Sequence, residues 1–72
     1  MIEEIIMNLK SDGISVQIGE EGQILFSANS RTCVLDVEAK AAYDENDFNN
    51  SYNYEEVEEI EDVVRDILSV SR

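Results

Sequence analysis

The chain has 72 residues, of which seventeen are acidic and five are basic, and its formal net charge at pH 7 is −12. This length allows a single domain, residues 1–72, that buries only about 60% of the surface its unfolded form exposes. The negative field repels phosphate and anionic lipid, so we expect no direct binding to nucleic acid or to a membrane surface. No run approaches the roughly 18 apolar residues that a membrane-spanning helix needs.

Cys33 is the only cysteine in the sequence, which excludes a disulfide within the chain. A lone cysteine, and an acidic opening segment where a signal peptide would be basic, are typical of a protein of the reducing cytoplasm. We therefore expect a cytoplasmic domain that folds without crosslinks, which its hydrophobic share of 43% also indicates.

The first expected element is a helix over residues 2–11. Ile5, Ile6 and Leu9 continue the helical spacing that begins at the second residue, so one face of this helix is apolar. Gly13 can adopt the left-handed backbone conformation that commonly ends a helix.

Three strands are expected next, at residues 14–18, 23–28 and 32–38, because apolar and polar residues alternate there. Tight turns join them into hairpins. One face of the predicted sheet is strongly apolar, and the other is polar except for Leu25 and Val34, which are expected to pair across neighbouring strands. The predicted apolar face comprises Ile14, Val16, Ile18, Ile24, Phe26, Cys33, Leu35 and Val37.

Residues 39–52 are rich in asparagine, aspartate and serine, whose side chains bond to their own backbone and favour turns. This composition predicts a long polar loop, which in a small domain is usually functional or mobile. At its start, residues 40–43 either extend the third strand or begin a short turn.

A second helix is expected over about residues 54–70. Asn53 is a suitable N-cap, Glu56 completes a capping box, and Tyr52 and Val57 can form a hydrophobic staple around the cap. The apolar stripe of this helix consists of Val57, Ile60, Val64, Ile67 and Leu68.

These elements predict an α+β fold with two layers, in the order αβββα, in which two helices cover one face of a three-stranded antiparallel sheet. The edges of so small a sheet stay open. A homodimer formed by edge pairing or by helix packing therefore remains an alternative to a monomer.

The residue types argue against catalysis. The chain has no histidine, which removes the usual general base and the usual metal ligand. Cys33 falls on the predicted apolar face, where a buried and inert thiol is expected. A calcium loop beginning at Asp44 would require a ligand at Phe48 and a glycine at Asn49, and neither is present. We expect no enzyme activity, no cofactor and no specific metal site, and a weak divalent-cation site stays open as an alternative.

The second half of the chain concentrates the negative charge, and aromatic residues are interleaved with the carboxylates. Carboxylates around aromatic anchors are typical of a surface that binds an arginine- and lysine-rich protein. Proteins that bind nucleic acid belong to this class of arginine- and lysine-rich partners. A solvated helix face is the simpler interpretation of the same charges. The predicted partner-binding residues are Asp44, Glu45, Asp47, Tyr52, Tyr54, Glu55, Glu58, Glu59 and Asp62.

The order of the expected elements resembles that of a known group of proteins. The chain opens with a helix at residues 2–10, continues with a strand after Gly13 and two further strands, and ends with a glutamate-rich helix. It resembles the small acidic proteins encoded by phages and prophages of Gram-positive bacteria, among them the type II anti-CRISPR inhibitors. The resemblance covers most of the chain in topology and charge, but in sequence only its first quarter. It implies an αβββα fold and an inhibitor that occupies a basic DNA-reading site by mimicking DNA. A homodimeric accessory protein whose acidic surface only maintains solubility is the alternative.

Overall fold

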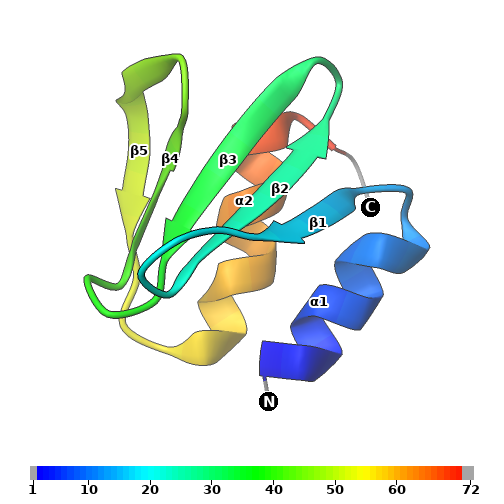
Figure 1. The fold of residues 1–72 in the computed structure, drawn as a ribbon, viewed down its shortest axis with the longest axis horizontal. Coiled ribbons are helices and arrows are strands. Elements are labelled where there is room, and N and C mark those ends of the chain that lie inside the picture. The colour runs from blue at the N-terminus through cyan, green and yellow to red at the C-terminus, as the bar shows by residue number, and fades with distance from the viewer. Residues whose placement is uncertain (1, 71–72) are drawn as a thin grey trace.

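The computed structural model describes residues 2–70, which form an α+β fold of two layers. A five-stranded antiparallel sheet has the strand order β1-β2-β3-β4-β5, and both helices lie against one of its faces (Figure 1). The predicted class is confirmed, but the predicted number of strands, three, is wrong. The elements are α1 (Ile2–Ser11), β1 (Ser15–Ile18), β2 (Gln23–Ala28), β3 (Arg31–Asp36), β4 (Ala41–Asp44), β5 (Asp47–Asn53), the 3-10 turn η1 (Val57–Glu59) and α2 (Ile60–Leu68).

Helix α1 begins and ends close to where the sequence predicts. Its apolar stripe places Ile5 and Leu9 in the core. Gly13 has φ of +87°, and the N–H of Ile14 donates to the carbonyl of Leu9 at 3.2 Å while the N–H of Gly13 donates to that of Lys10 at 3.0 Å. These two bonds form a Schellman motif, which requires the left-handed conformation that glycine adopts without strain.

Strands β2 and β3 form the centre of the sheet, and their inward side chains face the helices. Leu25 lies opposite Val34 on the other face, so the predicted cross-strand pair is confirmed. Two residues of the predicted apolar face are exposed instead. Ile18 is 71% exposed at the end of the edge strand β1, and Val37 lies beyond the end of β3 in the turn toward β4.

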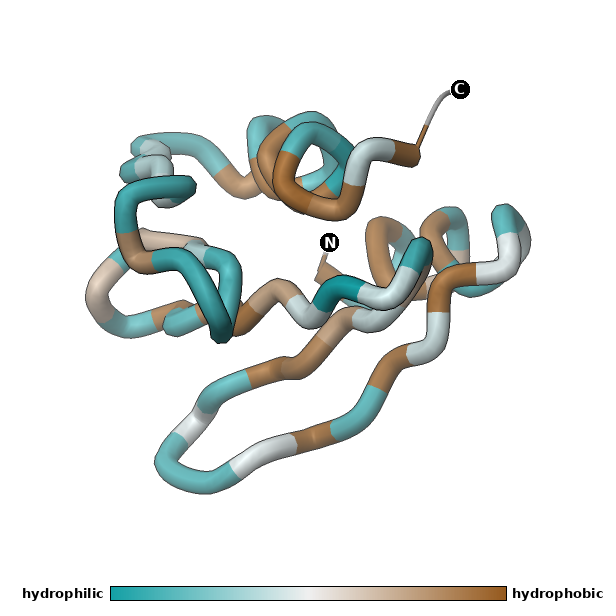
Figure 2. Tube along the Cα trace, turned by 90° about the horizontal axis from the view of Figure 1, so that it is seen from above, coloured by the Kyte–Doolittle hydropathy of each residue, from teal (hydrophilic) through white to brown (hydrophobic). Residues whose placement is uncertain are grey.

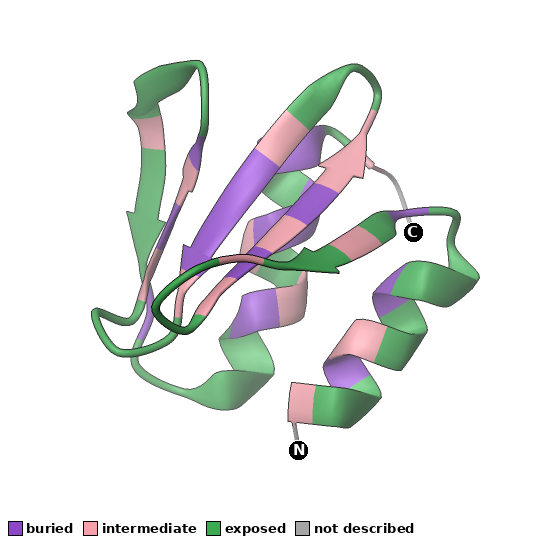
Figure 3. Cartoon of the chain, in the orientation of Figure 1, coloured by how far each residue is buried: buried purple, intermediate pink, exposed green. Residues whose placement is uncertain are grey.

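The segment predicted as a long polar loop is a β-hairpin. Strand β4 pairs with β3, with Leu35 opposite Ala42, and β5 pairs in turn with β4. The turn between them is closed by Asp44, whose Oδ1 accepts the N–H of Asn46 at 2.9 Å. The side chains of Asp44 and Asp47 therefore bond to the nearby backbone as expected, but the segment forms two strands joined by one tight turn rather than a loop. Strand β5 is exposed along almost its whole length (Figure 3).

Helix α2 begins later than predicted. Asn53 belongs to β5, and the chain first forms η1, so neither the predicted N-cap nor the predicted staple exists. The capping box lies three residues further along: one carboxylate oxygen of Glu59 accepts the N–H of Glu56 at 2.8 Å and that of Glu55 at 3.2 Å. A carboxylate in this position satisfies N–H groups that the helix leaves unpaired.

The core lies between the sheet and the two helices, and the apolar side of α2 is turned toward the strands (Figure 2). The predicted stripe of α2 is largely confirmed, since Ile60, Val64, Ile67 and Leu68 are buried there. Val57 is its exception and is exposed. The core comprises Ile5, Leu9, Ile14, Ile24, Phe26, Cys33, Leu35, Ala42, Tyr54, Ile60, Val64, Ile67 and Leu68.

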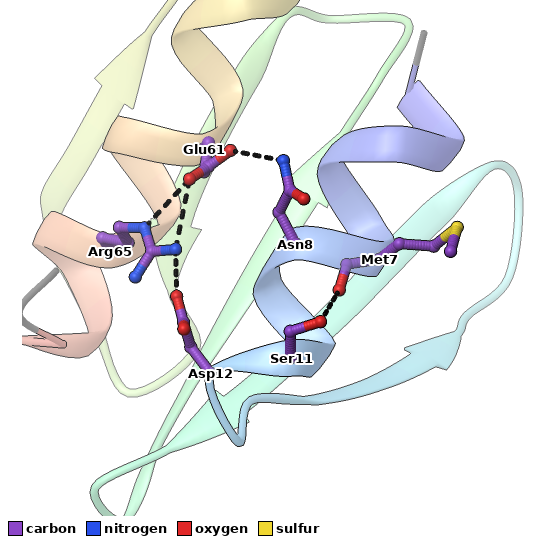
Figure 4. Close-up of polar contacts among 6 residues, drawn as sticks. All are labelled: Met7, Asn8, Ser11, Asp12, Glu61 and Arg65. Atoms are coloured by element: carbon purple, nitrogen blue, oxygen red, sulfur yellow. Dashed lines mark hydrogen bonds and ion pairs between the residues drawn. The ribbon is translucent and has the colours of Figure 1, made fainter.

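Polar contacts connect the last turn of α2 to the rest of the molecule. Arg65 is buried and forms ion pairs with Asp12, just after α1, and with Glu61 one turn earlier on α2 (Figure 4). At the C-terminal end of α2, Nδ2 of Asn29 donates to the carbonyls of Leu68 and Ser69, both at 3.0 Å. The turn between β2 and β3 thus satisfies carbonyl groups that the end of the helix leaves unpaired.

Candidate binding site on the open face of the sheet

The face of the sheet that the helices leave uncovered carries an apolar row. Leu25, Val34 and Tyr43 occupy matching positions on β2, β3 and β4, so each lies directly opposite the next. Side chains at such positions stand about 5 Å apart and pack against one another. Val34 is only 4% exposed although it does not belong to the core beneath the helices. The row is therefore a small second apolar cluster, on the opposite side of the sheet from the core.

An irregularity in the β4–β5 hairpin places an aromatic ring beside this row. Tyr43 pairs with Ser51, whereas the next residue, Asp44, pairs with Asp47, so β5 has extra residues at this point. A bulge of this kind redirects side chains. Among these residues, Phe48 packs on Tyr43 with ring centroids 5.4 Å apart and planes inclined by 53°. Phe48 nevertheless remains 72% exposed, so a large apolar side chain stays in contact with water.

The row and the aromatic pair border a shallow hollow, which we call the open-face hollow, of about 390 Å³. Its walls are apolar at the centre and carry the carboxylates of Glu20 and Glu45. None of the described residues that line it is a lysine or an arginine. The lining residues are Gly19, Glu20, Gln23, Leu25, Val34, Tyr43, Glu45 and Phe48.

A second hollow continues the negative charge around the lower end of the sheet. It has a volume of about 550 Å³ and shares Gln23 with the open-face hollow. Its carboxylates belong to Glu21 in the turn after β1, to Asp36 at the end of β3 and to Glu38 in the turn after β3. The apolar residues of the open-face hollow thus lie next to a group of carboxylates on the same side of the molecule.

The nine residues predicted to bind a partner fall into two groups at opposite ends of β5. Asp44, Glu45 and Asp47 lie in and beside the hairpin turn, and the others follow from Tyr52 onward. A strand rises about 3.3 Å per residue, so the seven residues of β5 separate the groups by up to about 20 Å. The structure therefore does not bring the nine residues together into one surface.

The hairpin group contributes one carboxylate to the open-face hollow. Glu45 lines it. Asp47 is exposed, and its Oδ1 accepts the N–H of Asn49 at 3.1 Å. Asp44 is buried and lies opposite Cys33, on the face that the helices cover, where its carboxylate closes the hairpin turn. Asp44 consequently offers no surface to a partner.

The second group divides between surface and structural positions. Tyr52 lies opposite Ala42 and so faces away from Tyr43, on the other side of the sheet. Tyr54 is buried in the core, and Glu59 caps the start of η1. The remaining members, Glu55, Glu58 and Asp62, are exposed on or before the last helix.

Sequence reasoning missed the centre of this site. The sequence places Phe48 in a predicted loop and leaves residues 40–43, which include Tyr43, open between a strand extension and a turn. It connects Leu25 and Val34 only as a pair. The signal that connects them is the alternation of β2, β3 and β4, which puts one apolar residue of each strand on the outward face.

The thiol of Cys33 lies in an environment that makes it unreactive. Cys33 is fully buried, and burial together with the negative charge of Asp44 raises its pKa to about 12. The reactive thiolate is therefore a negligible fraction near neutral pH. Within residues 2–70, no three histidine, cysteine, aspartate or glutamate side chains are grouped so as to hold a metal ion.

Comparisons with protein-family models, with curated proteins and with solved structures found no match to this chain. None of the helices in residues 2–70 has the length and apolar character required to cross a membrane. The function of the chain is therefore inferred from its fold and from the open-face hollow.

Proposed function

We propose that this protein is a binding protein that engages a basic protein surface through the open-face hollow. The observation that carries the proposal is the exposed ring of Phe48, held against Tyr43 beside an apolar row that no helix covers. Aromatic side chains in such positions supply most of the binding energy in many interfaces, because they bury a large area at a small cost in conformational entropy.

The surrounding charge supports a basic partner. Glu20 and Glu45 line the hollow, and Glu21, Asp36 and Glu38 line the adjoining one. The chain as a whole carries a net charge of −12. Such a field accelerates encounter with a positively charged surface and disfavours an acidic one, and added salt screens both effects.

Nucleic-acid-binding proteins are the partner class that fits best, since they carry the most extensive clusters of lysine and arginine. An acidic protein with an apolar anchor would occupy such a surface in place of the nucleic acid. This refinement agrees with the function implied by the resemblance to phage-encoded inhibitors, and the charge and exposed apolar residues of the chain support it independently.

A homodimer is the second candidate, and strand β5 favours it. As the last strand of the sheet, β5 has one edge without a neighbouring strand, and Asp47 is its only charged residue. Exposed edges of this length are templates for pairing with another copy unless charge or proline protects them. Light scattering at high protein concentration tests this candidate, and a monomeric mass would exclude it.

Two matched substitutions test the binding proposal. Phe48→Ser removes the exposed ring from the hollow, and Met7→Ser removes a side chain of similar exposure, 67% against 72%, from α1. A basic protein captured by the immobilised chain at low salt is then purified, and its Kd is measured for all three proteins. We expect Phe48→Ser to weaken binding at least about tenfold, which corresponds to roughly 1.4 kcal/mol, and Met7→Ser to leave it unchanged. Equal affinities for the wild type and Phe48→Ser would refute the proposal.

A further inference from the structure

The open-face hollow contains an uncovered aromatic surface. The ring planes of Phe48 and Tyr43 are inclined by 53°, so the two rings do not stack face to face. Phe48 is 72% exposed, and both rings line the hollow. The face of an aromatic ring carries partial negative charge, which attracts a cation within about 6 Å of the ring centre. The rings therefore offer a surface to a cation as well as to an apolar group.

A glycine leaves the apolar floor of the hollow open. Gly19 follows β1, and its N–H donates to the carbonyl of Gln23 at 2.8 Å. A Cβ at this position would lie 3.6 Å from Cγ of Leu25 and would cover part of that side chain. Because Gly19 has no side chain, Leu25 stays partly exposed beside the buried Val34. The hollow can thus accept the methylene groups of a long side chain.

Two carboxylates border the hollow from opposite sides. Glu45 follows β4 in the hairpin that carries both rings, and Glu20 follows β1 beyond the other end of the apolar row. Both side chains are exposed, and neither forms a hydrogen bond or an ion pair with another residue of the range 2–70. No lysine or arginine among the described lining residues neutralises them. Both carboxylates are therefore available to a cation from a partner.

We propose that the open-face hollow receives the side chain of an arginine from the basic protein partner. The guanidinium plane lies on the exposed ring of Phe48, next to the carboxylate of Glu45, and the methylene stem lies along Leu25. Arginine commonly buries its stem on apolar surface while its charged end stays near polar groups. The inference rests on the proposed function for the nature of the partner, and it adds which side chain of that partner the hollow selects.

Arginine fits this arrangement better than lysine. Exposed carboxylates attract both side chains, and water and salt weaken that attraction. The rings make the difference, because a guanidinium group is planar, weakly hydrated and stacks on aromatic faces, whereas an ammonium group is compact and strongly hydrated. The N–H groups of a guanidinium point outward in its own plane, so it can bond to Glu45 while its face lies on Phe48.

Two peptides of equal charge test the inference without knowledge of the partner. Nona-arginine and nona-lysine, both with blocked termini, are titrated into the protein, and each Kd is measured by calorimetry at the same salt concentration. We expect nona-arginine to bind at least about threefold more tightly, because contact with the rings adds to the attraction between opposite charges. The methyl NMR signals of Leu25 and Val34 should shift more with nona-arginine. Equal affinities for the two peptides would overturn the inference.

Matched variants locate the preference for arginine. Phe48→Leu keeps an apolar side chain and removes the ring, whereas Tyr52→Leu removes another exposed aromatic residue of β5, on the other face of the sheet. We expect the ratio of the two Kd values to fall by about half or more in Phe48→Leu and to stay unchanged in Tyr52→Leu. A ratio that survives Phe48→Leu, or that falls equally in both variants, would reject the hollow as the arginine site.

The role of the carboxylate has its own control. Glu45→Gln removes one carboxylate of the hollow, and Asp66→Asn removes an equal charge from an exposed position on α2. We expect Glu45→Gln to weaken the binding of nona-arginine about twofold more than Asp66→Asn does. Equal effects would show attraction by the overall charge only and would contradict the assigned geometry.

The arginine inference and the proposed function fail separately. If the two peptides bind equally well while Phe48→Ser still weakens binding of the captured partner, the inference is wrong and the proposed function stands. If Phe48→Ser leaves the Kd of the captured partner unchanged, the proposed function is refuted whatever the peptides show.

Discussion

Arg65 on α2 forms an ion pair with Asp12, which directly follows α1, and this contact joins the two helices on the same side of the sheet. Arg65 is buried, and its second ion-pair partner is Glu61 at 3.1 Å. Asn8 of α1 also donates to Glu61 at 3.4 Å, so the contact extends into a small network (Figure 4). A buried guanidinium depends on such partners, because removing one leaves charge uncompensated.

Asp12→Asn is therefore expected to destabilise the fold. Asp12 is partly exposed and Glu61 remains, so we expect a loss in the lower part of the range of about 1–3 kcal/mol that it costs to leave a buried polar group without its partner. Denaturant unfolding measures the change. In an Arg65→Met background the same substitution should have almost no effect, because the partner is gone. A cost that is equal in both backgrounds would contradict a direct coupling of the two residues.

Cys33 predicts how stability changes at alkaline pH. The thiol ionises near pH 9.0 in the unfolded chain but only near pH 12 in the folded protein. Its contribution to stability is therefore fully present below pH 9.0 and is lost as the pH rises toward 12, at up to about 1.4 kcal/mol per pH unit.

The comparison with Cys33→Ala isolates this thiol from other groups that titrate in the same range. The variant is expected to be less stable at neutral pH, because it leaves a cavity, but to lose stability less steeply above pH 9.0. Parallel stability curves for the two proteins would contradict the account. The native thiol is also expected to resist alkylation at neutral pH.

The capping role of Glu59 gives a third prediction. Glu59→Ala removes the acceptor for the N–H groups of Glu55 and Glu56 and should cost about 1 kcal/mol in the free energy of unfolding. Glu58→Ala is the matched control, since it removes an equal charge from the neighbouring exposed position. Thermal unfolding of both variants measures the difference. If Glu58→Ala were the more destabilising change, the assigned cap would be wrong.

The elements with clear periodicity were predicted well. Helix α1, its end at Gly13, and the central strands β2 and β3 follow from the spacing of apolar residues, because burying one face is what stabilises them. Strands β4 and β5 could not be recognised in this way. Their sequence is rich in residues that favour turns. Pairing of β4 with β3, and of β5 with β4, decides that they become strands, and this pairing leaves no periodicity in their own sequence.

The candidate site was predicted only in its general character. The sequence indicates acidic residues with aromatic neighbours, but it does not distinguish a carboxylate that faces solvent from one with a structural role. Asp44 closes a turn and Glu59 caps a helix, and both depend on where β5 ends and η1 begins. The position of Phe48 depends on a shift in strand register, which arises only from the pairing of β4 with β5.

The most direct test of the central claim is methyl NMR of the protein with and without a captured basic partner. The account predicts that the signals of Leu25 and Val34 shift or broaden on binding, because both line the open-face hollow. Signals of the core residue Val64, which is fully buried beneath the sheet, should change little. Perturbations confined to α1 and α2, with Leu25 and Val34 unaffected, would contradict it.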